Sequence, residues 1–126
     1  MLLVKTKLCT SSIHGLGIFA AENIEKGRIV WEYREPFDRQ WSKNYVESLP
    51  VVSREYVKHF CALLHNGNFL VTGDNDRFWN HSNNPNCLTD CEAKTTVALR
   101  NIKEGEEMTE DYSMYCSEEK ILFQDQ

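Results

Sequence analysis

A polar run that holds two adjacent aromatic residues limits what this chain can fold into. Residues 77–87 read Arg-Phe-Trp-Asn-His-Ser-Asn-Asn-Pro-Asn-Cys, within a chain of 126 residues. Asparagine and serine side chains compete with the backbone for hydrogen bonds, so the run predicts a loop or a short helical turn. Phe78 and Trp79 would hold this loop against the core. Ligand sites concentrate on such scaffolded loops, and an asparagine-rich surface turn is the alternative interpretation.

Length and composition predict one globular domain over residues 1–126. Hydrophobic residues make up 41% of the chain and charged residues 26%, which is ordinary for a globular protein. No stretch approaches the roughly 20 apolar residues of a membrane span, and residues 1–5 lack the layout of a signal peptide. We therefore expect no membrane partner, and a cytoplasmic protein, or a nuclear one if the source or its host is eukaryotic.

Charge and cysteine usage narrow the class of partner. The net charge of −5 and the pI near 5.3 argue against direct nucleic-acid binding, which needs clustered Lys and Arg. Acidic residues gather near the C-terminus, so a basic protein partner is compatible with this chain. The cysteines are odd in number and irregularly spaced, which predicts reduced thiols. They are Cys9, Cys61, Cys87, Cys91 and Cys116.

The pattern along the chain is one of short strands with a helical insertion. A helix is predicted over residues 42–49, and a second one would be capped by Ser53 and run through Leu64. Strands are predicted where β-branched and aromatic residues cluster or alternate. These segments are 2–7, 17–20, 28–33, 69–72, 95–100 and 107–112.

Three motifs follow one another in an informative order. Residues 13–20 read Ile-His-Gly-Leu-Gly-Ile-Phe-Ala, the polar run comes second, and residues 105–112 read Gly-Glu-Glu-Met-Thr-Glu-Asp-Tyr. Together with the Glu32-Tyr33 pair, this ordered set resembles the SET-domain protein-lysine methyltransferases. The chain is most similar to the compact stand-alone members of bacteria and large viruses, which lack a zinc-binding tail.

The resemblance implies a fold as well as a family. A mainly β (β+α) SET-domain fold is expected, with small curved sheets and one inserted helical segment at residues 42–64. The segment carrying Tyr112 would thread beneath the loop carrying Asn80 and His81, which makes a knot-like crossing. A short C-terminal tail would cover residues 113–126. The two similar turns at residues 23–27 and 101–105 would lie at opposite ends of the fold.

The resemblance also implies a reaction and its residues. The family transfers a methyl group from S-adenosyl-L-methionine to a lysine ε-amine, which requires the reacting atoms to be aligned. Tyr112 is the expected catalytic residue, and Tyr33 the expected second aromatic wall of the lysine channel. His81 is expected to be structural or cofactor-binding and to transfer no proton. The expected cofactor-binding residues are His14, Gly15, Leu16, Gly17, Asn80 and His81, with Tyr115 or Phe123 stacked on the adenine.

Two departures from the family pattern stand out. Glu110 occupies the position where relatives often carry a Phe or Tyr that limits the number of methyl groups. After the catalytic tyrosine the chain has only Cys116 in place of a Cys-x-Cys zinc cluster, so no metal is expected. The expected partner is a protein with an exposed lysine in a basic, histone-like tail, which would make this a chromatin regulator. The chain is expected to be a monomer or a homodimer.

Two other interpretations remain open. His81, Cys87, Cys91 and Cys116 could bind a metal, although only Cys87 and Cys91 approach the close spacing of a structural zinc site. A non-catalytic peptide-binding module with a degenerate site is the second alternative. Cofactor binding without methyl transfer would identify it.

Overall fold

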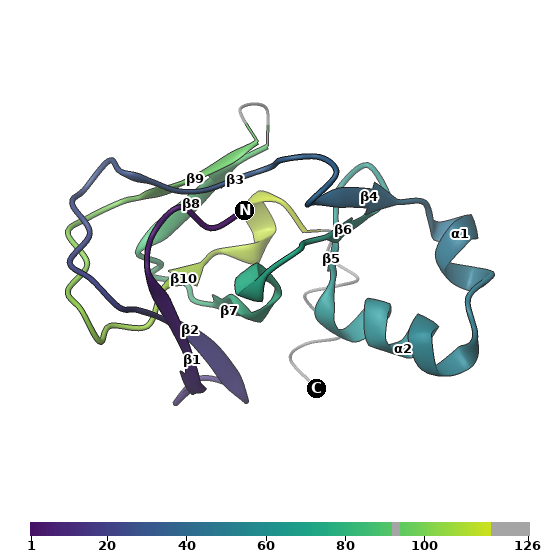
Figure 1. Cartoon of the computed structure of the whole chain (residues 1–126), viewed down its shortest axis with the longest axis horizontal. Coiled ribbons are helices and arrows are strands. Elements are labelled where there is room, and N and C mark those ends of the chain that lie inside the picture. The colour runs from purple at the N-terminus through teal and green to yellow at the C-terminus, as the bar shows by residue number, and fades with distance from the viewer. Residues whose placement is uncertain (92–93, 117–126) are drawn as a thin grey trace.

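The fold of this chain consists of small sheets joined around a central crossing (Figure 1). The computed structural model describes residues 1–91 and 94–116. Strands β1 (Thr6–Thr10) and β2 (Leu16–Ala20) form an antiparallel hairpin at the start of the chain. The first strand therefore begins later than predicted, and Leu2 instead makes an isolated bridge to Trp31.

A three-stranded antiparallel sheet holds one side of the core. Its strands are β3 (Ile29–Glu32), β9 (Thr95–Ala98) and β8 (Cys87–Asp90), in the order β3-β9-β8. β-branched and aromatic residues favour this pleated, half-buried surface, and Val30, Trp31 and Thr96 are buried on it. The hydrophobic cluster beneath includes Ile18, Ile102 and Met108.

A second three-stranded sheet carries the helical insertion, which lies at the right of Figure 1. Strands β4 (Arg39–Trp41), β6 (Phe69–Val71) and β5 (Ala62–Leu63) run in the order β4-β6-β5. Helices α1 (Lys43–Glu47) and α2 (Val51–Phe60) follow β4. The Ser42 hydroxyl caps α1 by accepting a hydrogen bond from the Tyr45 amide at 3.1 Å.

The second helix differs from its prediction at both ends. Pro50 is its N-cap, and the helix begins at Val51, so Ser53 lies inside it and does not cap it. It ends at Phe60 because Cys61 is extended and the next residues pair with β6 as strand β5. Only Val57 of this helix is buried, whereas Tyr56 is exposed, so the predicted apolar face is narrower than its sequence pattern.

The crossing is a short parallel pair at the centre of Figure 1. Strand β7 (Asn80–His81) follows the 3-10 helix η1 (Asn75–Phe78), and strand β10 (Thr109–Glu110) precedes the 3-10 helix η2 (Tyr112–Met114). β7 pairs with β10 in parallel. The polar run is therefore a loop at its centre, flanked by η1 and by β8. The mainly β architecture with a helical insertion is confirmed.

The two similar turns do not lie at opposite ends of the fold. Ile24 and Ile102 form an antiparallel bridge, and each amide donates to the other's carbonyl at 2.8 Å. Both side chains are 1% exposed and belong to the main hydrophobic cluster. Their shared sequence therefore reflects two units that pair with each other, which corrects the expectation.

Candidate active site

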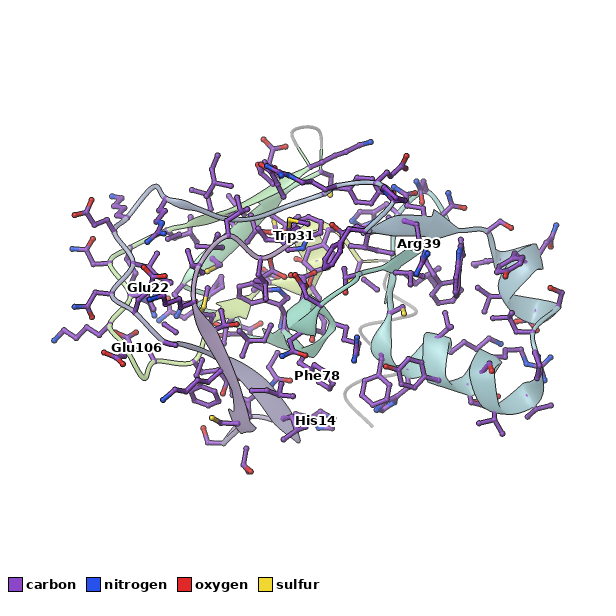
Figure 2. All side chains as sticks on the ribbon, in the orientation of Figure 1. His14, Glu22, Trp31, Arg39, Phe78 and Glu106 are labelled. Atoms are coloured by element: carbon purple, nitrogen blue, oxygen red, sulfur yellow. The ribbon has the colours of Figure 1, made fainter. Side chains whose placement is uncertain are left out.

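The site is built on the amide of Asn80, which ties the first motif to the crossing. Its Nδ2 donates to the His14 carbonyl at 3.0 Å, the Leu16 carbonyl at 3.1 Å and Glu107 Oε2 at 2.9 Å. Asn80 is 6% exposed, so these partners replace water that the amide would otherwise bind. The loop that carries His14 lies at the free end of the β1–β2 hairpin (Figure 2).

Gly17 allows the hairpin to approach the third motif. A Cβ at this position would lie 2.6 Å from Glu107 Oε2 and 3.0 Å from Asn80 Nδ2, so a side chain here would displace the Glu107 carboxylate from its place beside Asn80. Glu107 also accepts a hydrogen bond from the Ser11 hydroxyl at 2.6 Å. Gly15 has a different role, since its φ of +46° places it in the left-handed region that favours glycine.

Asn86 holds the other strand of the crossing. Its Nδ2 donates to the Glu107 carbonyl at 2.8 Å, and its Oδ1 accepts from the Thr109 amide at 2.8 Å. Asn86 is 2% exposed. Asparagine suits this place because its side chain offers a donor and an acceptor with the spacing of a peptide group. The asparagines of the polar run thus substitute for backbone in the crossing.

His81 holds Tyr112, the predicted catalytic residue, through the backbone. Its Nδ1 accepts a hydrogen bond from the Tyr112 amide at 3.0 Å, and its Nε2 lies 3.0 Å from Asn83 Oδ1. An amide donor on Nδ1 and a carbonyl acceptor at Nε2 together assign the neutral tautomer with its proton on Nε2. His81 therefore orients Tyr112, in agreement with a role that transfers no proton.

Tyr112 is buried, and its hydroxyl donates to the Trp79 carbonyl. Burial, followed by the charges of nearby acidic groups, raises the pKa of the Tyr112 hydroxyl. The phenol consequently stays protonated and is no proton acceptor. Because its proton is engaged by Trp79, its oxygen lone pairs remain for another donor.

A cavity of about 490 Å³ opens beside Tyr112. Tyr33 is another wall of this cavity, and burial together with Glu35 raises the pKa of Tyr33 to about 12. The Lys94 ammonium lies 5.1 Å from the centre of the Tyr33 ring, a cation–π contact at the same cavity. Tyr33 and Tyr112, the two predicted channel walls, are therefore on one cavity.

Two buried carboxyl groups line this cavity, and neither was assigned a chemical role from the sequence. Asp76 is 8% exposed and accepts a hydrogen bond from Trp79 Nε1. Glu110 is 3% exposed and accepts from the hydroxyls of Thr89 and of Tyr115, the latter at 2.7 Å. Burial raises the pKa of both carboxyl groups, and the charge of Glu110 raises that of Asp76 further.

Tyr115 and Phe123 were the two predicted adenine contacts. The Tyr115 ring packs edge-on against Tyr112, with centroids 6.0 Å apart, and its hydroxyl binds Glu110. Phe123 lies outside the described residues. Asp111 accepts from the Ser113 amide and hydroxyl at 3.0 and 2.7 Å, which fixes the turn after β10.

The sequence patterns missed three residues of the site. Glu107 and Asn86 make partly buried hydrogen bonds between segments far apart in the chain, and Asp76 makes a buried local one to Trp79. Glu107 stands inside the third motif and Asn86 inside the second, so motif membership was a usable signal for both. Asp76 precedes the polar run and gave no such signal.

The described residues, 1–91 and 94–116, contain no group of three or more His, Cys, Asp or Glu side chains placed to bind a metal ion. Cys87 is buried and Cys91 is exposed, at opposite ends of the β8 segment. Within the same residues no helix is both long and apolar enough to cross a membrane.

Known proteins match this chain over most of its length. A family model described as SET domain matches residues 15–113. A histone-lysine N-methyltransferase of Schizosaccharomyces pombe, H3 lysine-4 specific, is 35% identical over 126 residues, covering 88% of this chain and 13% of that protein. An H3 lysine-36 specific histone-lysine N-methyltransferase of Candida albicans is 31% identical over 142 residues, covering 94% of this chain and 16% of that protein.

Solved structures match as well. A humanized mutant of the Chaetomium thermophilum Polycomb Repressive Complex 2 with an inhibitor bound has a TM-score of 0.65 at 26% identity, over 90% of this chain and 16% of that one. The complex ctPRC2, autoinhibited and bound to S-adenosylmethionine, has a TM-score of 0.66 at 24% identity, over 97% of this chain and 17% of that one. This chain thus spans between 13% and 17% of the relatives and solved chains named here. The ordered motifs, the crossing and the match over residues 15–113 agree, and the chain belongs to the SET-domain family.

Proposed function

We propose that this chain is an S-adenosylmethionine-dependent protein-lysine N-methyltransferase. The observation that carries the proposal is the position of Tyr112 at a junction. Its amide is bonded to His81 in the crossing that anchors the 14–17 loop, and the residue itself lines the cavity of about 490 Å³. Methyl transfer needs such a junction, because donor and acceptor must meet at one point from two sides.

The loop of residues 14–17, with Asn80 and His81, would hold the cofactor. The fit rests on the chemistry of these groups: backbone carbonyls and amides, an imidazole, and open space where a Cβ of Gly15 would project. S-adenosylmethionine supplies an electrophilic methyl group on a sulfonium when bound. Tyr115 and Phe123 stay proposed adenine contacts, and removal of residues 120–126 should weaken cofactor binding if Phe123 has this role.

Tyr112 and Tyr33 would act on the acceptor side. The Tyr112 hydroxyl donates its hydrogen bond to the Trp79 carbonyl, so its oxygen can accept a hydrogen bond from an N–H of the incoming amine and orient the nitrogen lone pair. The two aromatic rings would surround the lysine stem and exclude water. An amine in such a channel is easier to hold in its neutral form, since burial disfavours the ammonium.

The proposed substrate is a lysine in a basic segment of a protein. The net charge of −5 favours such a partner, and the named relatives are histone-lysine N-methyltransferases. We propose a histone-like tail as the substrate, which would make the protein a chromatin regulator, nuclear in a eukaryotic source or host and otherwise cytoplasmic. A single domain over residues 1–126, as a monomer or homodimer, is part of the same proposal.

Methyl-deuterated cofactor tests this function. The protein is incubated with the cofactor and a mixture of basic proteins, and peptides are read by mass spectrometry for a deuterated methyl on a lysine ε-nitrogen. A labelled lysine that depends on added protein is the expected result. Calorimetry on chelator-treated protein should show cofactor binding without metal. Binding without any labelled lysine would favour the peptide-binding module, and absence of both would contradict the proposal.

A further inference from the structure

Glu110 raises a question that the aromatic walls of the cavity do not answer. It follows the crossing at the end of β10, one position before the Asp111-Tyr112 pair, and its side chain lines the same cavity as Tyr112. A carboxyl group that is 3% exposed is costly to bury. Its burial in the wall of the cavity that Tyr112 also lines therefore suggests a chemical role.

The proposed reaction leaves one proton without a destination. A lysine in water is an ammonium ion, with an ordinary pKa of about 10.4, and an ammonium nitrogen has no lone pair to receive a methyl group. Tyr112 cannot take this proton, because it is a protonated phenol bonded to the Trp79 carbonyl. His81 has both ring nitrogens engaged, and His65, at the exposed rim, has its Nε2 on the Ser113 carbonyl.

Of the two buried carboxyl groups, Glu110 is the one placed to be ionised. Asp76 accepts a hydrogen bond from Trp79 Nε1, whereas Glu110 accepts from the hydroxyls of both Thr89 and Tyr115. Burial and the neighbouring charge raise the pKa of Asp76 well above its usual range, which disfavours its charged form. Burial raises the pKa of Glu110 too, but the hydroxyls of Thr89, Tyr115 and Thr96 oppose that rise by donating to the carboxylate. When two carboxyl groups share one site, their environments separate their pKa values in this way, so that one is ionised more readily than the other.

A second observation shows that the cavity is suited to a polar occupant. Trp31 is 4% exposed and lines the cavity, yet its Nε1 has no hydrogen-bond partner among the described residues. Thr72 Oγ1 and Arg77 Nε are also buried on the cavity wall, and neither has a hydrogen-bond partner among the described residues. Trp31 is labelled near the middle of the molecule in Figure 2. A peptide lysine offers both kinds of partner, N–H donors at its tip and carbonyl acceptors on its main chain.

On the basis of the proposed function, we infer that Glu110 is the proton acceptor for the substrate ammonium. Thr89 donates to Oε1 and Tyr115 to Oε2, and with the Thr96 hydroxyl they use three of the four lone pairs of the carboxylate, which leaves one for the ammonium. The N–H bond of the ammonium breaks, an O–H bond forms on the Glu110 carboxylate, and the electron pair stays on nitrogen. After product leaves, the proton passes from Glu110 to solvent through the cavity.

Several charged or titratable groups surround Glu110, and each enters the interpretation of a pH profile. Asp76 and Arg77 come from η1, Cys87 and Cys91 from the β8 segment, and Lys94 from the turn before β9. Those from the η2 segment are Tyr112, Tyr115 and Cys116. The burial of Cys87 raises the pKa of its thiol, which keeps that group neutral.

A pH–rate profile with Glu110→Gln tests the inference. In the wild type the rate at saturating cofactor and lysine peptide should rise with pH and reach a plateau once Glu110 is ionised. E110Q should be at least about tenfold slower at that plateau, and its rate should keep rising as bulk water deprotonates the amine. Glu104→Gln makes the same chemical change on an exposed turn, and it should leave both rate and profile unchanged. A rate within threefold of wild type, or the same plateau in E110Q, would overturn the inference.

A measurement without turnover separates this inference from the proposed function. With S-adenosylhomocysteine in place of the cofactor, infrared difference spectra follow the C=O stretch of protonated carboxylic acids. Adding a lysine peptide should increase this band in the wild type and not in E110Q, and an arginine peptide should leave it unchanged. Failure of methyl transfer in the wild type would contradict only the proposed function, whereas an unchanged band would contradict the role of Glu110.

Thr89→Val keeps the test decisive if E110Q does not fold. This change removes a hydroxyl that stabilises the Glu110 carboxylate, so the pKa of Glu110 should rise. The acidic limb of the pH–rate profile should then move to higher pH, with cofactor affinity unchanged. An acidic limb that stays in place would overturn the inference.

Discussion

The crossing and the cavity are adjacent, and they treat buried polar groups in opposite ways. In the crossing, Asn80, Asn86 and Glu107 pair with one another's strands through hydrogen bonds of 2.8 to 3.1 Å. In the cavity, two carboxyl groups are buried together, and the indole N–H of Trp31 has no partner within residues 1–91 and 94–116. Tyr112 belongs to both regions. The difference indicates that the crossing is built for rigidity and the cavity for a ligand.

The largest effect is expected from breaking the crossing with Asn80→Ala. The change removes the donor shared by two carbonyls and the Glu107 carboxylate in partly buried hydrogen bonds, each worth about 0.5–1.5 kcal/mol, or about 1.5–3 kcal/mol for the charged acceptor. Urea denaturation should show a loss of about 2–5 kcal/mol, and calorimetry should show loss of cofactor binding. Asn84→Ala, on an exposed residue of the same run, should change neither. An N80A protein as stable as wild type would contradict the role given to the crossing.

A smaller effect is expected from Gly17→Ala, which strains the crossing without removing a bond. The added Cβ would meet Glu107 Oε2 at 2.6 Å, and overpacking of this kind costs about 1–3 kcal/mol. Thermal denaturation measures the loss. Shortening Glu107 to Ala in the G17A background should recover part of the cost of the alanine, because the clash disappears. Fully additive effects of the two changes would show that the contact is not the cause.

The cavity should respond to pH where the crossing does not. The pKa of Asp76 is raised in the folded state above its unfolded value of about 4, so folding binds a proton. The contribution of Asp76 to the free energy of unfolding is therefore fully present below about pH 4. It falls as pH rises through the raised pKa, by at most about 1.4 kcal/mol per pH unit.

Asp76→Asn removes this dependence. Its free energy of unfolding should gain on that of the wild type as pH rises above about 4, as measured by urea denaturation across the pH range. Asp111→Asn provides the opposite sign, because the hydrogen bonds from Ser113 lower the pKa of Asp111 and its contribution is lost as pH falls. Parallel stability curves for D76N and wild type would contradict the burial of an ionisable Asp76.

The sequence was sufficient for the crossing and insufficient for the cavity. Asn80, His81, Gly17 and Tyr112 stand in ordered motifs, so their proximity could be predicted from the resemblance to a known family. Asp76 and Trp31 stand in ordinary strand or turn contexts, and only the folded chain brings them to one cavity. Glu110 was visible as a departure, but its burial against Thr89 and Tyr115 required the structure.

Local patterns failed where pairing partners decided the outcome. The helix predicted through Leu64 ends at Phe60 because Ala62–Leu63 pairs with β6, and this partner is separated from it by a loop. The two similar turns pair through Ile24 and Ile102, although the expectation from the resemblance placed them at opposite ends of the fold. Tertiary pairing thus overrides local helix propensity at the first place and decides the arrangement at the second.

The most direct test of the account is a paired measurement on Tyr112→Phe. The variant keeps the ring and loses the hydroxyl, so its stability should fall by only about 0.5–1.5 kcal/mol, the value of a typical hydrogen bond. Calorimetry should show nearly unchanged cofactor affinity, and methyl transfer to the best lysine substrate should fall by about 10²-fold or more. A fall in turnover of less than about threefold with binding intact would contradict the assignment of Tyr112 as the catalytic residue.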